Sequence, residues 1–268
     1  MRPARLLIQH PPPSNLPGKG VICFSVILLS IVPFSIHIDA WAAGLSLFLV
    51  VTAVLARDVQ AIHLSLFAAA GIAAPYLRPQ FRSWPYALLI PILSYGLVVL
   101  AVPRLRRSLL WLRPGNVDRE AVLSVAAVSV ISGTALVIWY HALNPDLAVQ
   151  LKNMPDMPVW LFPFAGMAFA VSNAAMEEFA FRGVVMQSLD STFGPGFVSI
   201  AVQAWLFGAM HFLQGFPKGG WGLAMTVVYG IMLGWIRRRS RGMLAPWAAH
   251  VCADLVIFAV LSGIVLSW

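Results

Sequence analysis

The sequence predicts an all-α protein, a polytopic transmembrane helical bundle of eight or nine spans with a polar cavity between the later helices. Of its 268 residues, 60% are hydrophobic and 10% are charged, with a mean hydropathy of +0.82. A soluble domain carries about 25% charged residues. The apolar runs are long and lack the two-residue alternation of an outer-membrane barrel, so the spans are expected to be helical. Ionisable residues interrupt the later runs, which indicates a polar interior there.

A span needs about 20 apolar residues, and this length divides the chain into nine candidate segments. The second and third are short and could form a hairpin that does not fully cross, which leaves eight spans as the alternative. The segments are 21–37, 39–56, 61–77, 84–103, 120–143, 158–189, 195–213, 220–237 and 243–267.

Charge divides the chain and predicts its orientation. Residues 1–20 are basic and proline-rich and are expected to be a cytoplasmic N-terminus, followed by a retained first helix. Residues 21–119 are interpreted as scaffold helices and residues 120–268 as the functional half. Arginines gather in the loops near 104–119 and 237–241. The positive-inside rule places those loops in the cytoplasm and, with nine spans, the C-terminus outside.

Composition also narrows the function classes. The net charge of +8 is explained by the loop arginines, so we expect an integral membrane protein with the lipid bilayer as a partner and no nucleic-acid binding. Cys23 and Cys252 both lie in apolar segments, which predicts neither a disulfide framework nor a zinc motif. The sequence has no G-x-S-x-G motif, which disfavours a serine nucleophile.

The most informative stretch is Ala174–Gly183, because it places three ionisable side chains inside a predicted span. Glu178 and Arg182 are four residues apart and share a helix face, so an ion pair is expected between them. Glu177 points about 100° away and has no charged partner at that spacing, which makes it the reactive candidate. Asn173, four residues before Glu177, could donate a hydrogen bond to it.

Two later helices carry polar residues at the same spacing. Gln203, Phe207 and His211 follow one stripe of the seventh segment, and His250 and Asp254 are four residues apart in the ninth. Asn173 and Gln203 are interpreted mainly as interhelical contacts. The candidate catalytic residues that can converge on one cavity are Glu177, His211, His250 and Asp254.

Such a set can activate water. A buried carboxylate can act as a general base, a histidine can shuttle the proton to a leaving amine, and a second histidine, oriented by Asp254, can donate to an oxyanion. The preferred interpretation uses no cofactor. The alternative is a divalent metal such as zinc held by Glu177, His211, His250 and Asp254, although H-E-x-x-H is absent. Straight spans place Glu177 and His211 at different depths, so the seventh helix is expected to begin inside the bilayer after Gly194-Pro195-Gly196.

Two other function classes remain open. Intramembrane glutamate, histidine, aspartate and arginine also line ion pathways, so a transporter or ion-coupled carrier is an alternative. A second alternative is a catalytically silent immunity-type membrane protein on the same scaffold. Replacing Glu177 by glutamine separates these classes, because it stops peptide cleavage in one case and gradient-driven uptake in another.

The ordered motifs resemble one family. Glu177-Glu178-x-x-x-Arg182, Phe207-x-x-x-His211 and His250-x-x-x-Asp254 follow one another on late hydrophobic segments, as in the CPBP family of CAAX prenyl endopeptidases and bacteriocin-processing enzymes, also called Abi. The similarity covers roughly the last 110 residues. The family typically has asparagine where this chain has Asp254, and an ionised aspartate cannot donate a hydrogen bond to an oxyanion.

The resemblance implies an intramembrane endopeptidase of the glutamic type, a hydrolase that some interpret as metal-dependent. It implies that Glu177 and His211 activate water, that His250 and Asp254 stabilise the oxyanion, and that Arg182 supports the site. Phe207 is expected to pack or to form a wall of the substrate groove. The expected partner is a membrane-associated protein or peptide, cleaved near a CAAX-like, peptide-precursor or C-terminal sorting segment.

Overall fold

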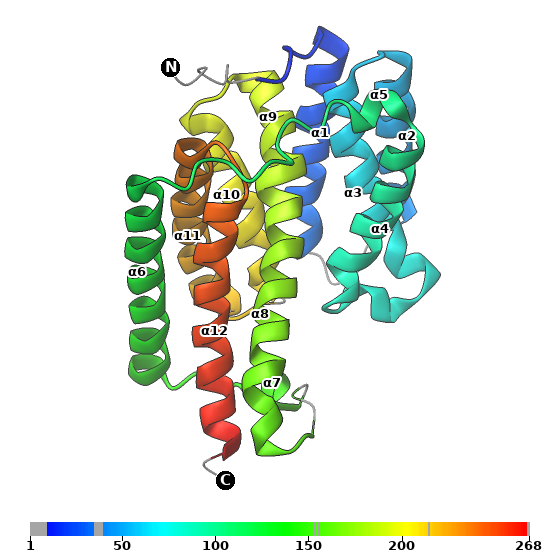
Figure 1. Ribbon diagram of the computed structural model, residues 1–268. Coiled ribbons are helices and arrows are strands. Elements are labelled where there is room, and N and C mark those ends of the chain that lie inside the picture. The colour runs from blue at the N-terminus through cyan, green and yellow to red at the C-terminus, as the bar shows by residue number, and fades with distance from the viewer. Residues whose placement is uncertain (1–9, 35–39, 153, 155, 214, 267–268) are drawn as a thin grey trace.

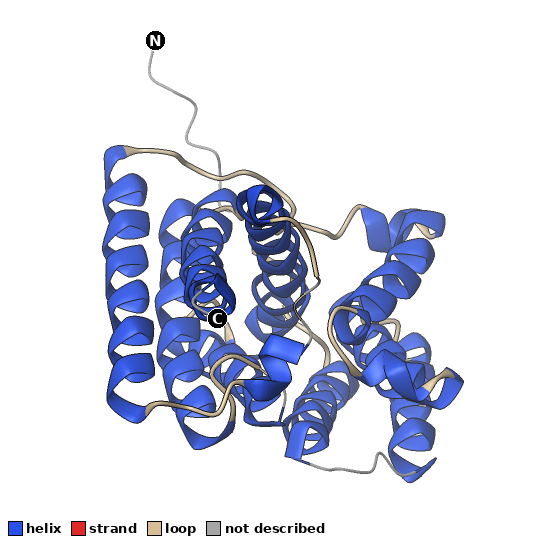
Figure 2. Ribbon diagram, turned by 90° about the horizontal axis from the view of Figure 1, so that it is seen from below, coloured by secondary structure: helices blue, strands red, loops and turns tan. Residues whose placement is uncertain are grey.

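The computed structural model describes residues 10–34, 40–152, 154, 156–213 and 215–266, and every regular element in this part of the chain is helical (Figures 1 and 2). This confirms the predicted all-α bundle. The principal helices are α1 (Leu16–Ile31), α2 (Ala40–Leu55), α3 (Val59–Leu77), α4 (Tyr86–Ala101), α6 (Arg119–Leu143), α8 (Phe162–Glu178), α9 (Met186–Phe193), α10 (Phe197–Leu213), α11 (Gly219–Ser240) and α12 (Leu244–Leu266). Short elements connect them: Val32–Phe34, Pro79–Arg82, α5 (Pro103–Arg106), α7 (Ala148–Lys152) and Val159–Leu161.

Within the described residues, five helical segments are long and apolar enough to cross a membrane, and four shorter apolar helices accompany them. Together they correspond to the nine predicted segments. The long ones are Val59–Leu77, Arg119–Leu143, Val159–Phe193, Gly219–Ser240 and Leu244–Gly263. Large apolar side chains such as Leu97 and Leu47 face outward, as expected where the surrounding solvent is lipid.

Some helix boundaries differ from the prediction because polar caps lie upstream of the apolar runs. Helix α1 begins at Leu16, inside the segment predicted as a loop, because the Asn15 side chain accepts a hydrogen bond from the Gly18 amide at 2.8 Å. Helix α3 begins at Val59 because Asp58 caps the Ala61 amide at 3.0 Å. Such caps satisfy amides that the first helical turn leaves unpaired. Residues 35–37 of the first predicted span lie outside the described residues.

The arginine-rich segments lie together at one end of the bundle. The loop after α5 packs on the connection between α11 and α12, where the Asn116 amide donates to the Ser240 carbonyl at 2.6 Å and the Met243 amide donates to the Arg113 carbonyl at 2.9 Å. Helix α1 starts at this end and α12 finishes at the opposite end (Figure 1). That this end faces the cytoplasm stays a prediction from the positive-inside rule.

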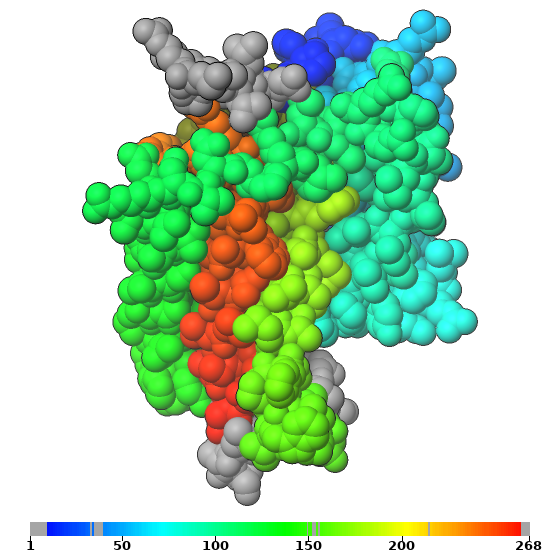
Figure 3. Space-filling view, viewed as in Figure 1, coloured from blue at the N-terminus to red at the C-terminus, as the bar shows by residue number. Residues whose placement is uncertain are grey.

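The early and late helices are tied together by buried polar contacts. The Gln187 side chain on α9 donates to the Gln60 side chain on α3 at 2.9 Å, and the Ser188 hydroxyl donates to the Gln60 carbonyl at 3.1 Å. The early helices extend less far from the arginine-rich end than α6, α8 and α12 do (Figure 3). The two groups therefore share a core near one end, and the late helices continue beyond it.

Glycines bring α10 and α11 into close contact. A β-carbon at Gly208 would lie 2.8 Å from the Leu223 carbonyl oxygen, and one at Gly230 would lie 3.0 Å from the Ala204 Cα. The Gln203 side chain crosses this interface and donates to the Gly230 carbonyl at 2.8 Å, which confirms its interhelical role. This contact fixes the helix that carries His211.

Candidate active site

The acidic doublet lies at the end of α8, where the helix changes its winding. The regular α-helix ends at Glu178 and continues as a π-helical segment, Phe179–Val185, before α9 begins. Such segments are rare and occur frequently at functional sites. Arg182 lies within it, and its Nη1 atom is 3.0 Å from Glu178 Oε1. The predicted ion pair between Glu178 and Arg182 is therefore confirmed.

Arg182 is completely buried and packs against an aromatic ring. Its side chain is 0% exposed, and its guanidinium carbon lies 4.4 Å from the centre of the Phe207 ring. Phe207 also contacts the rings of His211, at 5.1 Å, and His250, at 5.8 Å. Phe207 thus contacts the arginine and both histidines of the cluster.

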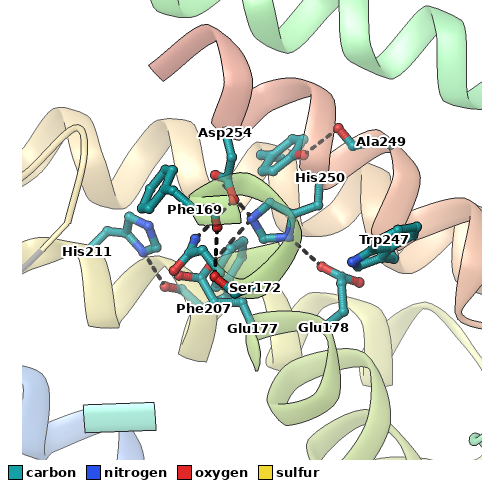
Figure 4. A network of polar contacts seen from close by, with 12 residues as sticks. Phe169, Ser172, Glu177, Glu178, Phe207, His211, Trp247, Ala249, His250 and Asp254 are labelled. Atoms are coloured by element: carbon teal, nitrogen blue, oxygen red, sulfur yellow. Dashed lines mark hydrogen bonds and ion pairs between the residues drawn. The ribbon is translucent and has the colours of Figure 1, made fainter. Parts of the chain in front are cut away.

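The His250 ring lies between the two glutamates. Its Nδ1 atom is 2.8 Å from Glu178 Oε1 and its Nε2 atom is 3.3 Å from Glu177 Oε2, whereas Asp254 Oδ1 is 3.8 Å from Nε2 (Figure 4). An ionised carboxylate can only accept, so Nδ1 carries the hydrogen toward Glu178. Glu178, and not Asp254 as predicted, makes the short contact that orients this ring.

Glu177 differs from Glu178 in lacking a strong partner. Its side chain is 12% exposed, and Oε2 is buried without a hydrogen bond among the described residues, although His250 Nε2 lies 3.3 Å away. Buried polar atoms are nearly always paired with protein or water. A reactive Glu177 needs an oxygen that is free to bind water, and Oε2 meets this requirement.

His211 reaches the cluster from α10. Its Nδ1 atom lies 3.1 Å from the Phe207 carbonyl oxygen, which can only accept, so Nδ1–H donates and Nε2 is left as an acceptor. In the close-up, His211 and His250 lie on either side of Glu177 (Figure 4). Two helices therefore present imidazoles to a carboxylate on a third.

The depth difference expected between Glu177 and His211 does not arise. The helix that carries Glu177 continues to Phe193, four residues beyond its predicted end, and turns through Gly194 into the antiparallel α10. Glu177 lies 16 residues before Phe193 and His211 lies 14 residues after Phe197. At 1.5 Å per residue the offset is about 3 Å. No displaced start of the seventh helix is needed to explain their proximity.

Asn173 contacts Asp254 and not Glu177. Its side-chain amide donates to Asp254 Oδ2 at 3.1 Å, and its carbonyl oxygen accepts from the Trp84 indole N–H at 2.7 Å. The predicted bond from Asn173 to Glu177 is therefore wrong, because α12 presents a carboxylate closer to the Asn173 amide. Asp254 acts as an acceptor in these contacts.

Three contributions to the site were missed by sequence reasoning. Glu178 was assigned only to Arg182, although it also binds His250. Trp84 was predicted as the first residue of the span 84–103, but α4 begins at Tyr86, and the Trp84 side chain reaches Asn173 from the preceding turn. Tyr229 on α11 packs edge-on against the His250 ring at 5.5 Å and donates to the Ala249 carbonyl at 3.2 Å. All three contacts join residues far apart in the sequence, so no local spacing signals them.

The side chains of the cluster do not offer the donor atoms of a metal site in a suitable arrangement. Among the described residues, no three histidine, cysteine, aspartate or glutamate side chains come together with the spacing of a metal site. His250 Nδ1 faces Glu178, and His211 Nδ1 faces a carbonyl, which leaves one ring nitrogen of each available. The arrangement as it stands does not form a zinc site, and we derive no step through a metal.

Comparisons with known proteins agree with the motifs. No curated protein and no solved structure matches the chain. Residues 158–256, which contain α8 to α11 and much of α12, match the family model described as Type II CAAX prenyl endopeptidase Rce1-like. This match confirms the resemblance predicted from the three motifs, and it covers the helices that carry the site.

Proposed function

We propose that this protein is an intramembrane endopeptidase that hydrolyses a peptide bond near a membrane-associated segment, with water activated by Glu177 and His211. The observation that carries the proposal is Glu177 Oε2, a buried carboxylate oxygen without a hydrogen bond, 3.3 Å from an imidazole. Glu178 has the same chemistry but is held by Arg182 and His250. Glu178 Oε2 is also buried without a hydrogen bond, but Glu178 Oε1 is engaged by both Arg182 and His250. Glu177 is therefore the carboxylate proposed to take a proton from water.

The reaction follows from these contacts. Glu177 accepts a proton from water while the water oxygen bonds to the scissile carbonyl carbon, and His211 Nε2 accepts a hydrogen bond from the same water. The carbonyl oxygen becomes an oxyanion, to which a doubly protonated His250 can donate from Nε2. The tetrahedral intermediate collapses as the proton on Glu177 passes to the amide nitrogen. The C–N bond breaks, which leaves a carboxylic acid and an amine.

Asp254 has a positioning role in this scheme. Its Oδ2 accepts from Asn173, and Oδ1 lies 3.8 Å from His250 Nε2. An ionised aspartate cannot donate to an oxyanion, so His250 supplies that hydrogen bond. Asp254 and Asn173 hold the α12 side of the site in place.

The substrate class follows from the location of the site. Glu177 lies near the middle of Val159–Phe193, the longest apolar helical segment described. A substrate must bring its scissile bond to that depth, which favours a protein or peptide with a membrane-tethered or hydrophobic C-terminal segment. CAAX-like proteins, peptide precursors and C-terminally sorted proteins all meet this requirement.

The test compares cells that produce the wild-type chain with cells that produce Glu177→Gln. A membrane precursor should accumulate in cells that produce the variant. The purified wild-type protein should cleave this precursor in detergent. Glu120→Gln is a matched control, because Glu120 is an exposed glutamate on α6 that pairs with Arg239. A Glu177→Gln protein that still cleaves would refute the mechanism. Gradient-driven uptake without hydrolysis would support a transporter instead.

Chelation decides between the two ways of activating water. In the proposed scheme the purified enzyme keeps its cleavage rate after treatment with a strong chelator and removal of bound metal. If cleavage is lost on chelation and restored by Zn²⁺, a metal activates the water, and the side chains of the site must move to bind it.

A further inference from the structure

A pocket lined by arginines lies at the arginine-rich end of the bundle, and it shares Arg182 with the candidate active site. It has a volume of about 160 Å³, and its charged lining consists of Arg113, Arg182, Arg237, Arg238, Arg241 and Asp190. Five guanidinium groups thus face one carboxylate. A cavity of about 150 Å³ is large enough for benzene, so this pocket has room for a phosphate group and is too small for a nucleotide.

The positive charge is only partly neutralised by the protein. Asp190 pairs with Arg238, and Glu178 pairs with Arg182. No carboxylate among the described residues pairs with Arg113, Arg237 or Arg241. Like charges gathered at low dielectric repel one another strongly unless an anion lies among them.

Buried donors in the lining are unpaired as well. Arg182 is fully buried, and its Nε and Nη2 atoms have no hydrogen-bond partner in the described part of the chain; the same holds for the buried Nε atoms of Arg113, Arg237 and Arg238. A buried charged donor that is left without a hydrogen-bond partner destabilises the folded protein. Planar guanidinium groups bind phosphate oxygens in pairs, so a phosphate would satisfy these donors.

The pocket wall is held firmly by the backbone. A β-carbon at Gly115, whose φ is +87°, would lie 2.5 Å from the Gly242 amide nitrogen. The Trp111 amide donates to the Gln187 side chain at 3.1 Å on the opposite side. The loop that carries Arg113 is therefore fixed between α9 and the end of α11, and its arginine is positioned before any ligand arrives.

We propose that this pocket binds the phosphate group of an anionic membrane lipid. Basic pockets between transmembrane helices at the membrane surface are suited to lipid headgroups. Exposed apolar residues lie close in the sequence to the lining: Leu112, next to Trp111, is 63% exposed, and Phe197, two residues after Pro195, is 65% exposed. A headgroup in the pocket can therefore have its acyl chains on these side chains.

The test measures ligand-dependent thermal stabilisation of the full chain in zwitterionic detergent. The probes are short-chain phosphatidate, short-chain phosphatidylcholine and inorganic phosphate. A ligand that binds the folded state raises the unfolding temperature as its concentration passes the Kd. We expect saturable stabilisation by phosphatidate, and at least about tenfold weaker binding of the other two probes, because they lack either the net charge or the apolar chains.

Variants locate the binding. The double variant Arg113→Gln/Arg237→Gln should weaken phosphatidate binding by about tenfold to a hundredfold, as expected for the loss of charged hydrogen bonds. Arg106→Gln/Arg107→Gln removes the same charge from exposed side chains at the same end and should leave the Kd unchanged. If the first double variant does not fold, Arg113→Lys, which keeps the charge but loses the paired geometry, should still weaken binding.

Two results would overturn the proposal. Equal weakening by the Arg106/Arg107 control would show a diffuse surface charge effect and no pocket. Equal affinity for inorganic phosphate and phosphatidate would assign the pocket to a free anion. Neither outcome depends on whether the protein cleaves peptides, so failure here leaves the proposed function standing.

Discussion

Two histidines are buried equally deeply in this protein, and their surroundings differ. His63 on α3 is 1% exposed, and its ring bonds the Tyr95 hydroxyl and the Ser108 hydroxyl, each at 2.7 Å. His250 on α12 is 3% exposed and contacts carboxylates of Glu178 and Glu177. Burial is thus the same in both regions, but one ring is satisfied by neutral groups and the other lies within a cluster of charges.

The difference shows what separates a structural histidine from a candidate catalytic one. Both nitrogens of His63 are used by hydroxyls that are themselves enclosed in the early helices. Around His250, the Glu177 oxygen lacks a hydrogen bond and the His211 ring is partly exposed. Unsatisfied buried charge is costly for stability and useful for chemistry. The following variants test whether this contrast holds.

The largest effect on cleavage is expected for His250→Gln. The ring touches both glutamates, so its loss removes the proposed oxyanion donor and the neighbour of Glu177. Cleavage should fall by about 10²- to 10⁴-fold, measured as kcat/KM per folded molecule. His141→Gln, at an exposed position near the end of α6, serves as the control. Cleavage by His250→Gln within about threefold of the wild type would contradict the assigned role.

Glu178→Gln should damage stability and cleavage together. It leaves Arg182 as a buried charge without its carboxylate and releases His250 Nδ1, and breaking a buried pair in this way costs about 3–5 kcal/mol. Thermal unfolding in detergent measures the loss. The double variant Glu178→Gln/Arg182→Met removes the orphaned charge, so it should recover stability without recovering cleavage. Recovery of both would show that Glu178 has no role in orienting His250.

Trp84→Phe tests whether the early helices contribute to the site. The variant removes the N–H that donates to Asn173 but keeps a ring that can pack against Phe169, 5.4 Å away. A single neutral hydrogen bond contributes about 0.5–1.5 kcal/mol, so cleavage should fall by no more than about tenfold. Trp235→Phe, on an exposed position of α11, is the control. An unchanged rate would confine the active site to the later helices.

His63→Ala should have the smallest effect on cleavage. It leaves the Tyr95 hydroxyl without its buried partner, at a cost of about 1–3 kcal/mol for an unsatisfied group, whereas the Ser108 hydroxyl still donates to the Leu105 carbonyl at 2.7 Å. The unfolding temperature should fall, while kcat/KM per folded molecule stays within about threefold of the wild type. A loss of cleavage as large as that of His250→Gln would abolish the distinction between the two histidines.

Local features of the site could be predicted from the sequence. The pair Glu178–Arg182 depends only on four-residue spacing in a helix, and the apolar runs are long enough to place nearly every helix. His211 and Asp254 were found for the same reason, because each shares a helical stripe with another candidate. The motif order then indicated a family that the later comparison matched over residues 158–256.

Contacts between helices could not be predicted in this way. Nothing in the spacing shows that Glu178 faces His250, that Asn173 faces Asp254, or that a loop tryptophan reaches Asn173. The division into a scaffold and a functional half at residues 119 and 120 is a prediction that Trp84→Phe addresses.

The central claim is that Glu177, and not its neighbour, activates the water. The most direct measurement compares the cleavage rate and unfolding temperature of Glu177→Gln with those of the wild type, in the same detergent and with the same precursor. The account predicts that cleavage falls by about 10²-fold or more while the unfolding temperature does not fall, because the replaced oxygen makes no hydrogen bond. Retained cleavage, or a protein that unfolds as Glu178→Gln does, would contradict it.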